Sequence, residues 1–260
     1  LAQAWSALGY KAKALAAAEQ AAAHAQGLPE EQRLQIDAQV QKAQHDWSKA
    51  IETARALVKL RPRNPEYRFQ LVSTLLAAGK PDAAQDALTM LMKLPGPIGN
   101  DPRVELEQAW VAREDKQVAA HAERALQQAR QREETGLAAE AGTLLGVARW
   151  HLGDLGGAEA ALKQARADYT RIGNPHGEAW ADQNLGNTYS GSNPAGAREA
   201  YQRALAGYQA IGDRNGEAAS YSDLGIMLWS AGDHDGTETA LRKWLAIRRD
   251  TEDLAGQAWN

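Results

Sequence analysis

A threefold internal repeat between Gly136 and Asp253 constrains the fold of this chain more than any other feature. The dipeptide Leu-Gly begins at positions 145, 185 and 224, and a tripeptide Gly-Glu-Ala or Gly-Gln-Ala begins at positions 177, 216 and 256. Successive copies are therefore 39 or 40 residues apart. A period of this length indicates a repeat array, in which each unit is a small supersecondary element that buries its apolar face only against its neighbours.

Each unit has the sequence of a helical hairpin. A first helix ends at a Gly-Asp pair or an equivalent turn, and a second helix follows with alanine and leucine along one face. This arrangement resembles the tetratricopeptide repeat. In the first unit the resemblance rests on Leu145-Gly146, Gly153-Asp154, Ala158, Leu162 and Ala165. It implies an all-α solenoid, a right-handed superhelix in which the first helix of each hairpin lines the concave face.

The resemblance extends over the whole chain in more than one form. Residues 1–95 carry a shorter period of 33 or 34 residues, and residues 96–135 keep a helical period without either signature, which predicts a degenerate hairpin. Residues 136–253 hold the three long repeats, and residues 254–260 match the start of a further one. We therefore predict a single solenoid over residues 1–260, with about seven hairpins and a partial one.

Side chains that can cap a helix mark several predicted helix starts. Asp46 stands where its carboxylate can accept hydrogen bonds from the free backbone N–H groups of a following helix. The same role is expected where Asn or Asp precedes a proline, because a proline at the first helical position needs no N–H partner. These pairs are Asn64-Pro65, Asp101-Pro102 and Asn193-Pro194.

Composition and motifs narrow the classes of function. The 29 lysines and arginines against 33 acidic residues give a net charge of -4 without a clustered positive field, so we expect no nucleic-acid partner. There is no cysteine, which excludes disulfides, thiolate zinc sites and thiol catalysis. Phosphate-loop, zincin and dinucleotide motifs are missing, so we predict no catalytic activity, no cofactor and no metal. Asp233-His234-Asp235 is interpreted as a turn with a helix cap.

No apolar run is long enough to cross a membrane, and we expect no direct membrane insertion. The compartment stays open, because the sequence fits the cytoplasm and also the extracytoplasmic part of a membrane-anchored protein. The start at Leu1 and the partial repeat at the other end are interpreted as the cuts of a fragment, with possible self-association through the exposed ends and through Trp259.

Aligning the three long repeats on Leu-Gly predicts which side chains face the concave groove. Trp150 and Trp229 occupy equivalent positions, as do Trp180 and Trp259. Large aromatic side chains in a groove are the usual anchors for a bound peptide, although tryptophans at these positions could instead fill space between hairpins. The predicted partner-binding residues are Glu140, Thr143, Val147, Trp150, His151, Trp180, Gln183, Asn187, Ser190, Ser222, Ile226 and Trp229.

Two functional hypotheses follow from these features. The stretches 94–107 and 216–232 resemble repeat regions attached to bacterial Ser/Thr kinases or winged-helix transcriptional regulators. The resemblance implies a non-catalytic protein-protein interaction module of a larger signalling or regulatory protein, with a protein or peptide partner. The alternative is a ligand-sensing module that binds a small molecule or peptide signal and controls an attached kinase or DNA-binding domain.

Overall fold

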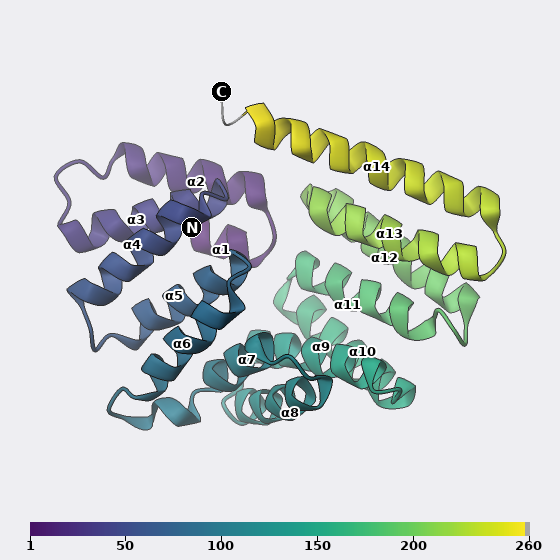
Figure 1. The fold of residues 1–260 in the computed structure, drawn as a ribbon, viewed down its shortest axis with the longest axis horizontal. Helices are drawn as coiled ribbons and strands as arrows, with labels where there is room; N and C mark the ends of the chain where they lie inside the picture. Colours follow the sequence, from purple (N-terminus) through teal and green to yellow (C-terminus); the bar gives the residue numbers. More distant parts are fainter. Residues whose placement is uncertain (258–260) are drawn as a thin grey trace.

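The computed structural model describes residues 1–257, which form fourteen α-helices, one short 3-10 helix and no strand (Figure 1). The all-α solenoid predicted from the repeats is confirmed. Consecutive helices pair into seven hairpins: α1 (Ala2–Ala7) with α2 (Lys11–Ala23), α3 (Glu30–Ala43) with α4 (Trp47–Leu60), α5 (Pro65–Ala77) with α6 (Pro81–Met92), α7 (Pro102–Val111) with α8 (Asp115–Gln131), α9 (Thr135–His151) with α10 (Leu155–Ile172), α11 (Pro175–Tyr189) with α12 (Pro194–Ile211), and α13 (Arg214–Ser230) with α14 (His234–Gln257). The short helix η1 (Pro97–Asn100) joins α6 to α7.

The four predicted helix caps are confirmed. Asp46 accepts a hydrogen bond from the backbone N–H of Lys49 at 3.2 Å, and Asn64 accepts one from Glu66 at 3.0 Å. Asp101 and Asn193 cap α7 and α12 in the same way. The cap expected in the turn Asp233-His234-Asp235 is confirmed too, because Asp233 accepts a hydrogen bond from the backbone N–H of Gly236. Caps that were not predicted stand at Asp154, Asn174 and Asp213. Each cap satisfies one of the N–H groups that a helix start leaves without an intrahelical partner.

The glycine of the Leu-Gly dipeptide stands where the second helix of the hairpin packs closely against the first. A Cβ atom added to Gly186 would lie 2.6 Å from the ring of Tyr201, and one added to Gly146 would lie 2.5 Å from the side chain of Leu162. Such distances are shorter than carbon atoms tolerate, so only glycine fits. The preceding leucine is buried at Leu145 and Leu185 and partly buried at Leu224. The dipeptide therefore supplies one core side chain and one close backbone contact.

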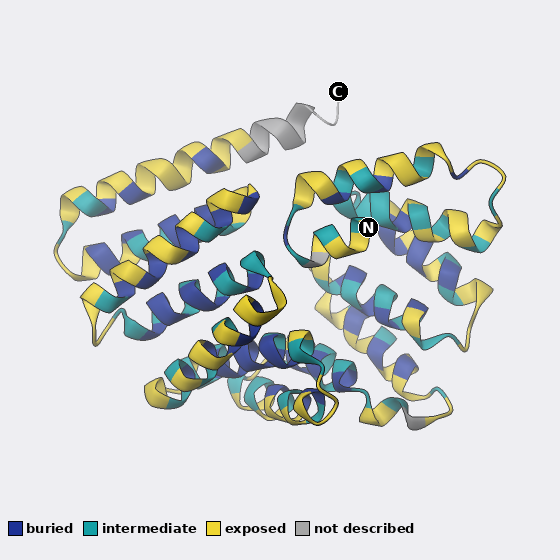
Figure 2. Ribbon diagram, turned by 180° about the vertical axis from the view of Figure 1, so that it is seen from behind, coloured by how far each residue is buried: buried dark blue, intermediate teal, exposed yellow. Residues whose placement is uncertain are grey.

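The core is a series of apolar clusters between successive hairpins. One cluster joins α4 to α7 around Val72 and Leu88, a second joins α7, α8 and α9 around Leu144, and a third joins α12, α13 and α14 around Tyr201. Figure 2 shows buried residues on the helix faces that meet other helices and exposed residues along the outer helices. Each hairpin thus depends on its neighbours for burial, as the repeat period predicted.

The array curls until its first hairpin meets its last third (Figure 1). The Lys11 ammonium lies 2.7 Å from Oδ1 of Asp213, and Nε2 of the His176 ring lies 3.3 Å from Oδ2 of the same carboxylate. Tyr10 packs against a buried cluster that includes Tyr208 and Ile211. We call these interactions of residues 9–11 with α11, α12 and the start of α13 the closure contact.

The last helix of the described chain is also its longest. Helix α14 has 24 residues and continues through 254–257, where the sequence suggested the start of a further repeat. Residues 258–260, including Trp259 with its predicted role in self-association, lie outside the described residues. Within residues 1–257, none of the helices combines the length and apolar character needed to span a bilayer.

Candidate functional site

The first helices of the hairpins form the inner face of the curled array. Helices α5, α7, α9, α11 and α13 contact one another in sequence, each touching the first helix of the next hairpin. Two cavities open on this face, and first helices supply most of the residues that line both of them. The inner face is therefore the surface on which the predicted groove residues can be examined.

Four of the predicted residues meet in one small cavity, which we call the C-terminal pocket. Trp150 comes from α9, Asn187 and Ser190 lie at the end of α11, and Ile226 comes from α13. The pocket has a volume of 250 Å³. Its remaining lining residues are Gly191, Tyr201, Asp223, Met227 and Ser230.

A chain of hydrogen bonds fixes the polar side of the C-terminal pocket. The Tyr201 hydroxyl donates to Oδ1 of Asn187 at 2.5 Å, and the Tyr208 hydroxyl donates to Oε1 of Gln183 at 3.2 Å. Gln183 in turn donates through Nε2 to Oδ2 of Asp223 at 2.7 Å. Burial raises the pKa of Asp223, while hydrogen bonds from Gln183 and Asn187 act in the opposite direction. The tyrosines thus orient two amides, and the amides orient one carboxylate.

The predicted groove residues differ in how much surface they offer to a partner. Trp229 and Ile226 are 63% and 64% exposed, although both are large and apolar. Val147 and Ser222 are partly buried, and His151 is exposed, with Nδ1 lying 2.8 Å from Oδ1 of Asp115. Thr143 is completely buried and donates its hydroxyl to the Ala139 carbonyl. Thr143 therefore belongs to the core and cannot contact a partner.

Trp180 belongs to a second group on the inner face. Its ring stacks on Trp110, with centroids 5.9 Å apart and planes 15° from parallel, and it packs against two core clusters. Nε1 of Trp110 donates to Oε1 of Glu140 at 3.0 Å, and burial raises the pKa of Glu140. Trp110 was not among the predicted residues. It stands 40 residues before Trp150, so extending the repeat step backward would have singled it out.

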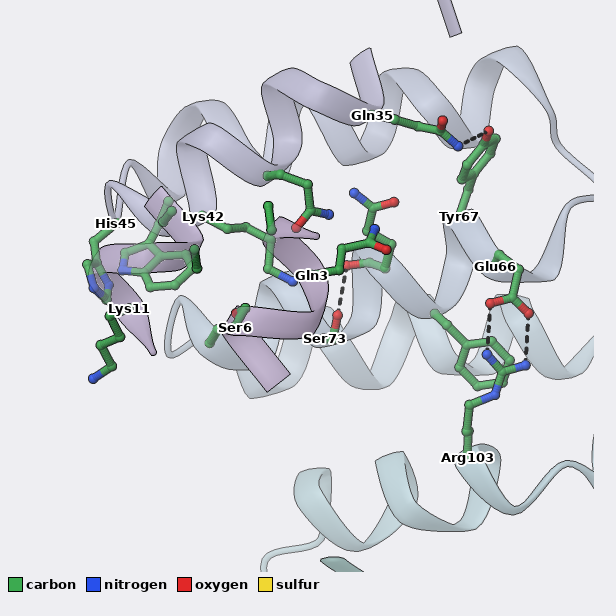
Figure 3. A pocket seen from close by; sticks show the side chains of 18 of the residues that line it. Gln3, Ser6, Lys11, Gln35, Lys42, His45, Glu66, Tyr67, Ser73 and Arg103 are labelled. Carbon is green, nitrogen blue, oxygen red and sulfur yellow. Dashed lines mark hydrogen bonds and ion pairs between the residues drawn. The ribbon is translucent and has the colours of Figure 1, made fainter. Parts of the chain in front are cut away.

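A larger cavity than the C-terminal pocket lies in the half of the inner face that the sequence alignment did not reach. This N-terminal cavity of 650 Å³ is lined chiefly by α1, α3, α5 and α7, and Figure 3 shows glutamine, serine and charged side chains around it. Burial lowers the pKa of Lys42 and, together with the neighbouring Glu140, raises the pKa of Glu107 to about 8. The sequence feature that could have pointed to this cavity is the pair Gln35 and Gln39, which are four residues apart and therefore lie on the same face of one helix.

The chemistry of the inner face is that of recognition. Its side chains are tryptophans, amides, hydroxyls and a few carboxyl groups, such as that of Glu140, whose pKa is raised by burial. Among the residues that the structure describes, no three histidine, aspartate or glutamate side chains come together in a way that would hold a metal ion. The arrangement can donate and accept hydrogen bonds along an elongated surface and can cover apolar side chains.

Seven stacked hairpins with a polar and aromatic inner face define a helical-repeat protein of the α-solenoid class. Residues 137–210, which span the hairpins α9–α10 and α11–α12, match the family model described as Tetratricopeptide repeat, so these two hairpins are tetratricopeptide repeats. No curated protein matches the chain.

Solved structures have the same fold at low sequence identity. The crystal structure of BtubC (BKLC) from P. vanneervenii is 21% identical with a TM-score of 0.57, covering 80% of this chain and 90% of that one. The structure of a Rap protein complexed with competence and sporulation factor is 16% identical with a TM-score of 0.63, covering 93% and 81%. The human IFIT1 dimer with m7Gppp-AAAA is 14% identical with a TM-score of 0.56, covering 94% and 58%.

Proposed function

We propose that this chain is a non-catalytic interaction module of a larger bacterial signalling or regulatory protein, and that it binds a peptide or protein segment along its inner face. The observation that carries the proposal is that Trp229 and Ile226, both largely exposed, lie three residues apart on α13, the helix that also supplies Asp223 to the C-terminal pocket. Exposed large apolar side chains beside fixed hydrogen-bonding groups are typical of binding surfaces.

The charge of the inner face favours a polypeptide over a nucleic acid as the partner. The chain has a net charge of -4, and the acidic groups Glu107, Glu140 and Asp223 on the inner face, whose pKa burial raises, carry either a negative charge or none. A polyanion gains affinity from clustered lysines and arginines, which neutralise its phosphates. The structure with m7Gppp-AAAA belongs to a protein of similar fold, and a fold of this class serves many kinds of ligand.

A random linear peptide library displayed on phage tests the proposal even though the natural partner is unidentified. Selection against the 260-residue chain should enrich peptides whose affinity can then be measured by calorimetry. We expect Trp229→Ala to weaken their binding by about thirtyfold, or about 2 kcal/mol, because an exposed aromatic anchor in a groove makes a large contribution to affinity.

The matched control is Trp244→Ala, which removes an exposed tryptophan from the second helix of the same hairpin. We expect this variant to bind the enriched peptides as the wild type does. If both tryptophan variants bound equally well, or if Trp244→Ala were the weaker binder, the inner face would not be the recognition surface.

A ligand-sensing role is the second candidate, and the closure contact favours it. Because residues 9–11 touch α11 and α12, a molecule that occupies the inner face could change how tightly the array is curled. The test is small-angle scattering with and without an enriched peptide. A change in the radius of gyration on binding would favour sensing, and an unchanged curve would favour a rigid scaffold.

A further inference from the structure

Asp223 is partly buried and differs from the buried aspartates of the hairpins around it. Asp182 is held between Arg166 and Arg203, at 3.0 Å and 2.8 Å, and Asp213 is paired with Lys11. Asp223 accepts a hydrogen bond from the Gln183 amide, yet no cationic side chain among the described residues lies within ion-pair distance of it. The fold therefore leaves this carboxylate with oriented neutral donors and without a counter-charge.

The C-terminal pocket gives this carboxylate a partly apolar surrounding. Trp150, Ile226 and Met227 line the pocket together with Asp223 and the hydroxyl-bearing Tyr201. A carboxylate in such a place pays a desolvation penalty that a well-placed cation offsets. A long basic side chain suits the pocket chemically, because its methylene stem can cover apolar surface while its charged head reaches the carboxylate.

We propose that the C-terminal pocket is a subsite for a lysine or arginine side chain of the polypeptide bound on the inner face, with Asp223 as the anionic contact and Trp150 as the aromatic wall. This inference rests on the proposed function and specifies the chemistry of the partner. The charged head forms a charge-assisted hydrogen bond with Asp223, and the indole adds a favourable cation–π interaction.

Other side chains fit the pocket less well. An acidic side chain would place a second negative charge beside Asp223, and an apolar one would bury the carboxylate further without pairing it. A neutral amide would compete with Gln183 and Asn187, which already donate to this carboxylate. Only a cationic side chain supplies the positive charge that Asp223 lacks in the pocket.

Two further carboxyl groups stand on the inner face without an ion pair among the described residues, Glu107 on α7 and Glu140 on α9. Burial raises the pKa of both groups, and a pKa of about 8 leaves Glu107 largely protonated at neutral pH. Lys42 and Arg103 act on Glu107, and His176 acts on Glu140. The subsite for a basic side chain therefore rests on Asp223, and one basic residue is enough to match it.

The experiment uses peptides enriched from the random library and a double-mutant cycle. Each lysine in an enriched peptide is replaced by norleucine and each arginine by citrulline, and affinity is measured for the wild type and for Asp223→Asn. We expect one basic residue whose neutralisation weakens binding to the wild type by about tenfold or more and has little effect on binding to Asp223→Asn. Glu199→Gln, the same charge change on an exposed site of α12, should bind like the wild type.

Each outcome decides one of the two proposals. If peptides that depend on Trp229 carry no basic residue, or bind as well after neutralisation, the subsite is overturned and the inner-face function stands. If no enriched peptide depends on Trp229 or Trp150, the inner-face function fails as well. Neutralising the basic residues of the peptide requires only the wild-type protein, so the need for a basic side chain can be measured even if Asp223→Asn does not fold. Indole NMR signals of wild type and Trp150→Phe then report whether the basic residue reaches the pocket.

Discussion

Tryptophans that the repeat alignment makes equivalent have different surroundings in the folded chain. Trp150 is partly buried, and residues of α11 and α13 lie beside it in the C-terminal pocket. Trp229 lies on α13, the first helix of the last described hairpin, and is largely exposed. Trp180 is held by its stack on Trp110 and by two core clusters. Burial and exposure are thus divided among different tryptophans, and packing accounts for Trp180, whose ring is held by its neighbours.

This difference predicts that the two alanine substitutions change stability by different amounts. Trp180→Ala should lower the free energy of unfolding by about 2 kcal/mol or more, because it leaves a gap against buried side chains. Trp229→Ala should change it by less than about 0.5 kcal/mol, as expected for an exposed site. Urea denaturation followed by circular dichroism measures both, and equal losses in the two variants would contradict the assignment.

Glu107 provides a pH test of the inner face. Burial and the neighbouring Glu140 raise its pKa from 4.5 to about 8, while Lys42 and Arg103 act to lower it. A carboxyl group with a raised pKa stabilises the fold fully below its unfolded pKa, and this contribution is lost as pH rises through the folded pKa. The advantage of Glu107→Gln in unfolding free energy should therefore grow between about pH 5 and about pH 9. Parallel stability curves for the two proteins would count against a raised pKa.

At the scale of single elements, the sequence predicted the features that depend only on nearby residues, such as helix caps and close helix packing within a hairpin. The caps at Asp46, Asn64 and Asp101 and the glycine of each Leu-Gly pair act within one hairpin, and the structure confirms the caps and explains the pairs. Trp110 was missed because α7 is short and its hairpin lacks the Leu-Gly signature that set the alignment. The N-terminal cavity was missed because amides spread over several first helices have no repeat of their own.

The close approach of α11 and α12 can be tested directly. Gly186→Ala places a methyl group against the buried ring of Tyr201, so we expect a loss of about 1 to 3 kcal/mol in the free energy of unfolding. Because Tyr201 also orients Asn187, peptide affinity should fall as well. The control is Gly156→Ala in α10, where a Cβ meets no atom within 4 Å and helix propensity favours alanine. Similar stability of the two variants would refute the close-packing interpretation.

At the scale of the whole molecule, the closure contact joins parts of the chain that no repeat period relates. Lys11 and Asp213 are 202 residues apart, and Asp213 also caps α13. Although burial acts to raise it, hydrogen bonds from His176 and Lys11 hold the pKa of Asp213 well below its usual range. Neither residue carries a sequence signal for this contact, because it arises from the accumulated curvature of the intervening hairpins.

Reversing the charge of Lys11 should open the array. Lys11→Glu places a carboxylate beside the buried Asp213, so we expect a larger radius of gyration in small-angle scattering and an unchanged helical content. The control is Lys116→Glu, the same change at an exposed site of α8 far from the contact in sequence. If the two variants scattered alike, the ends of the array would not be held together through Lys11.

The closure contact also changes how the array should lose its structure. In a linear stack the terminal hairpins have one neighbour each and fray first, so their amides exchange with solvent fastest. Here the first hairpin has a second neighbour, supplied by α11 and α12, and both partners gain protection from the same few residues. Fraying at the start of the chain should then be coupled to exchange near Ile211, so that two distant segments behave as one cooperative unit.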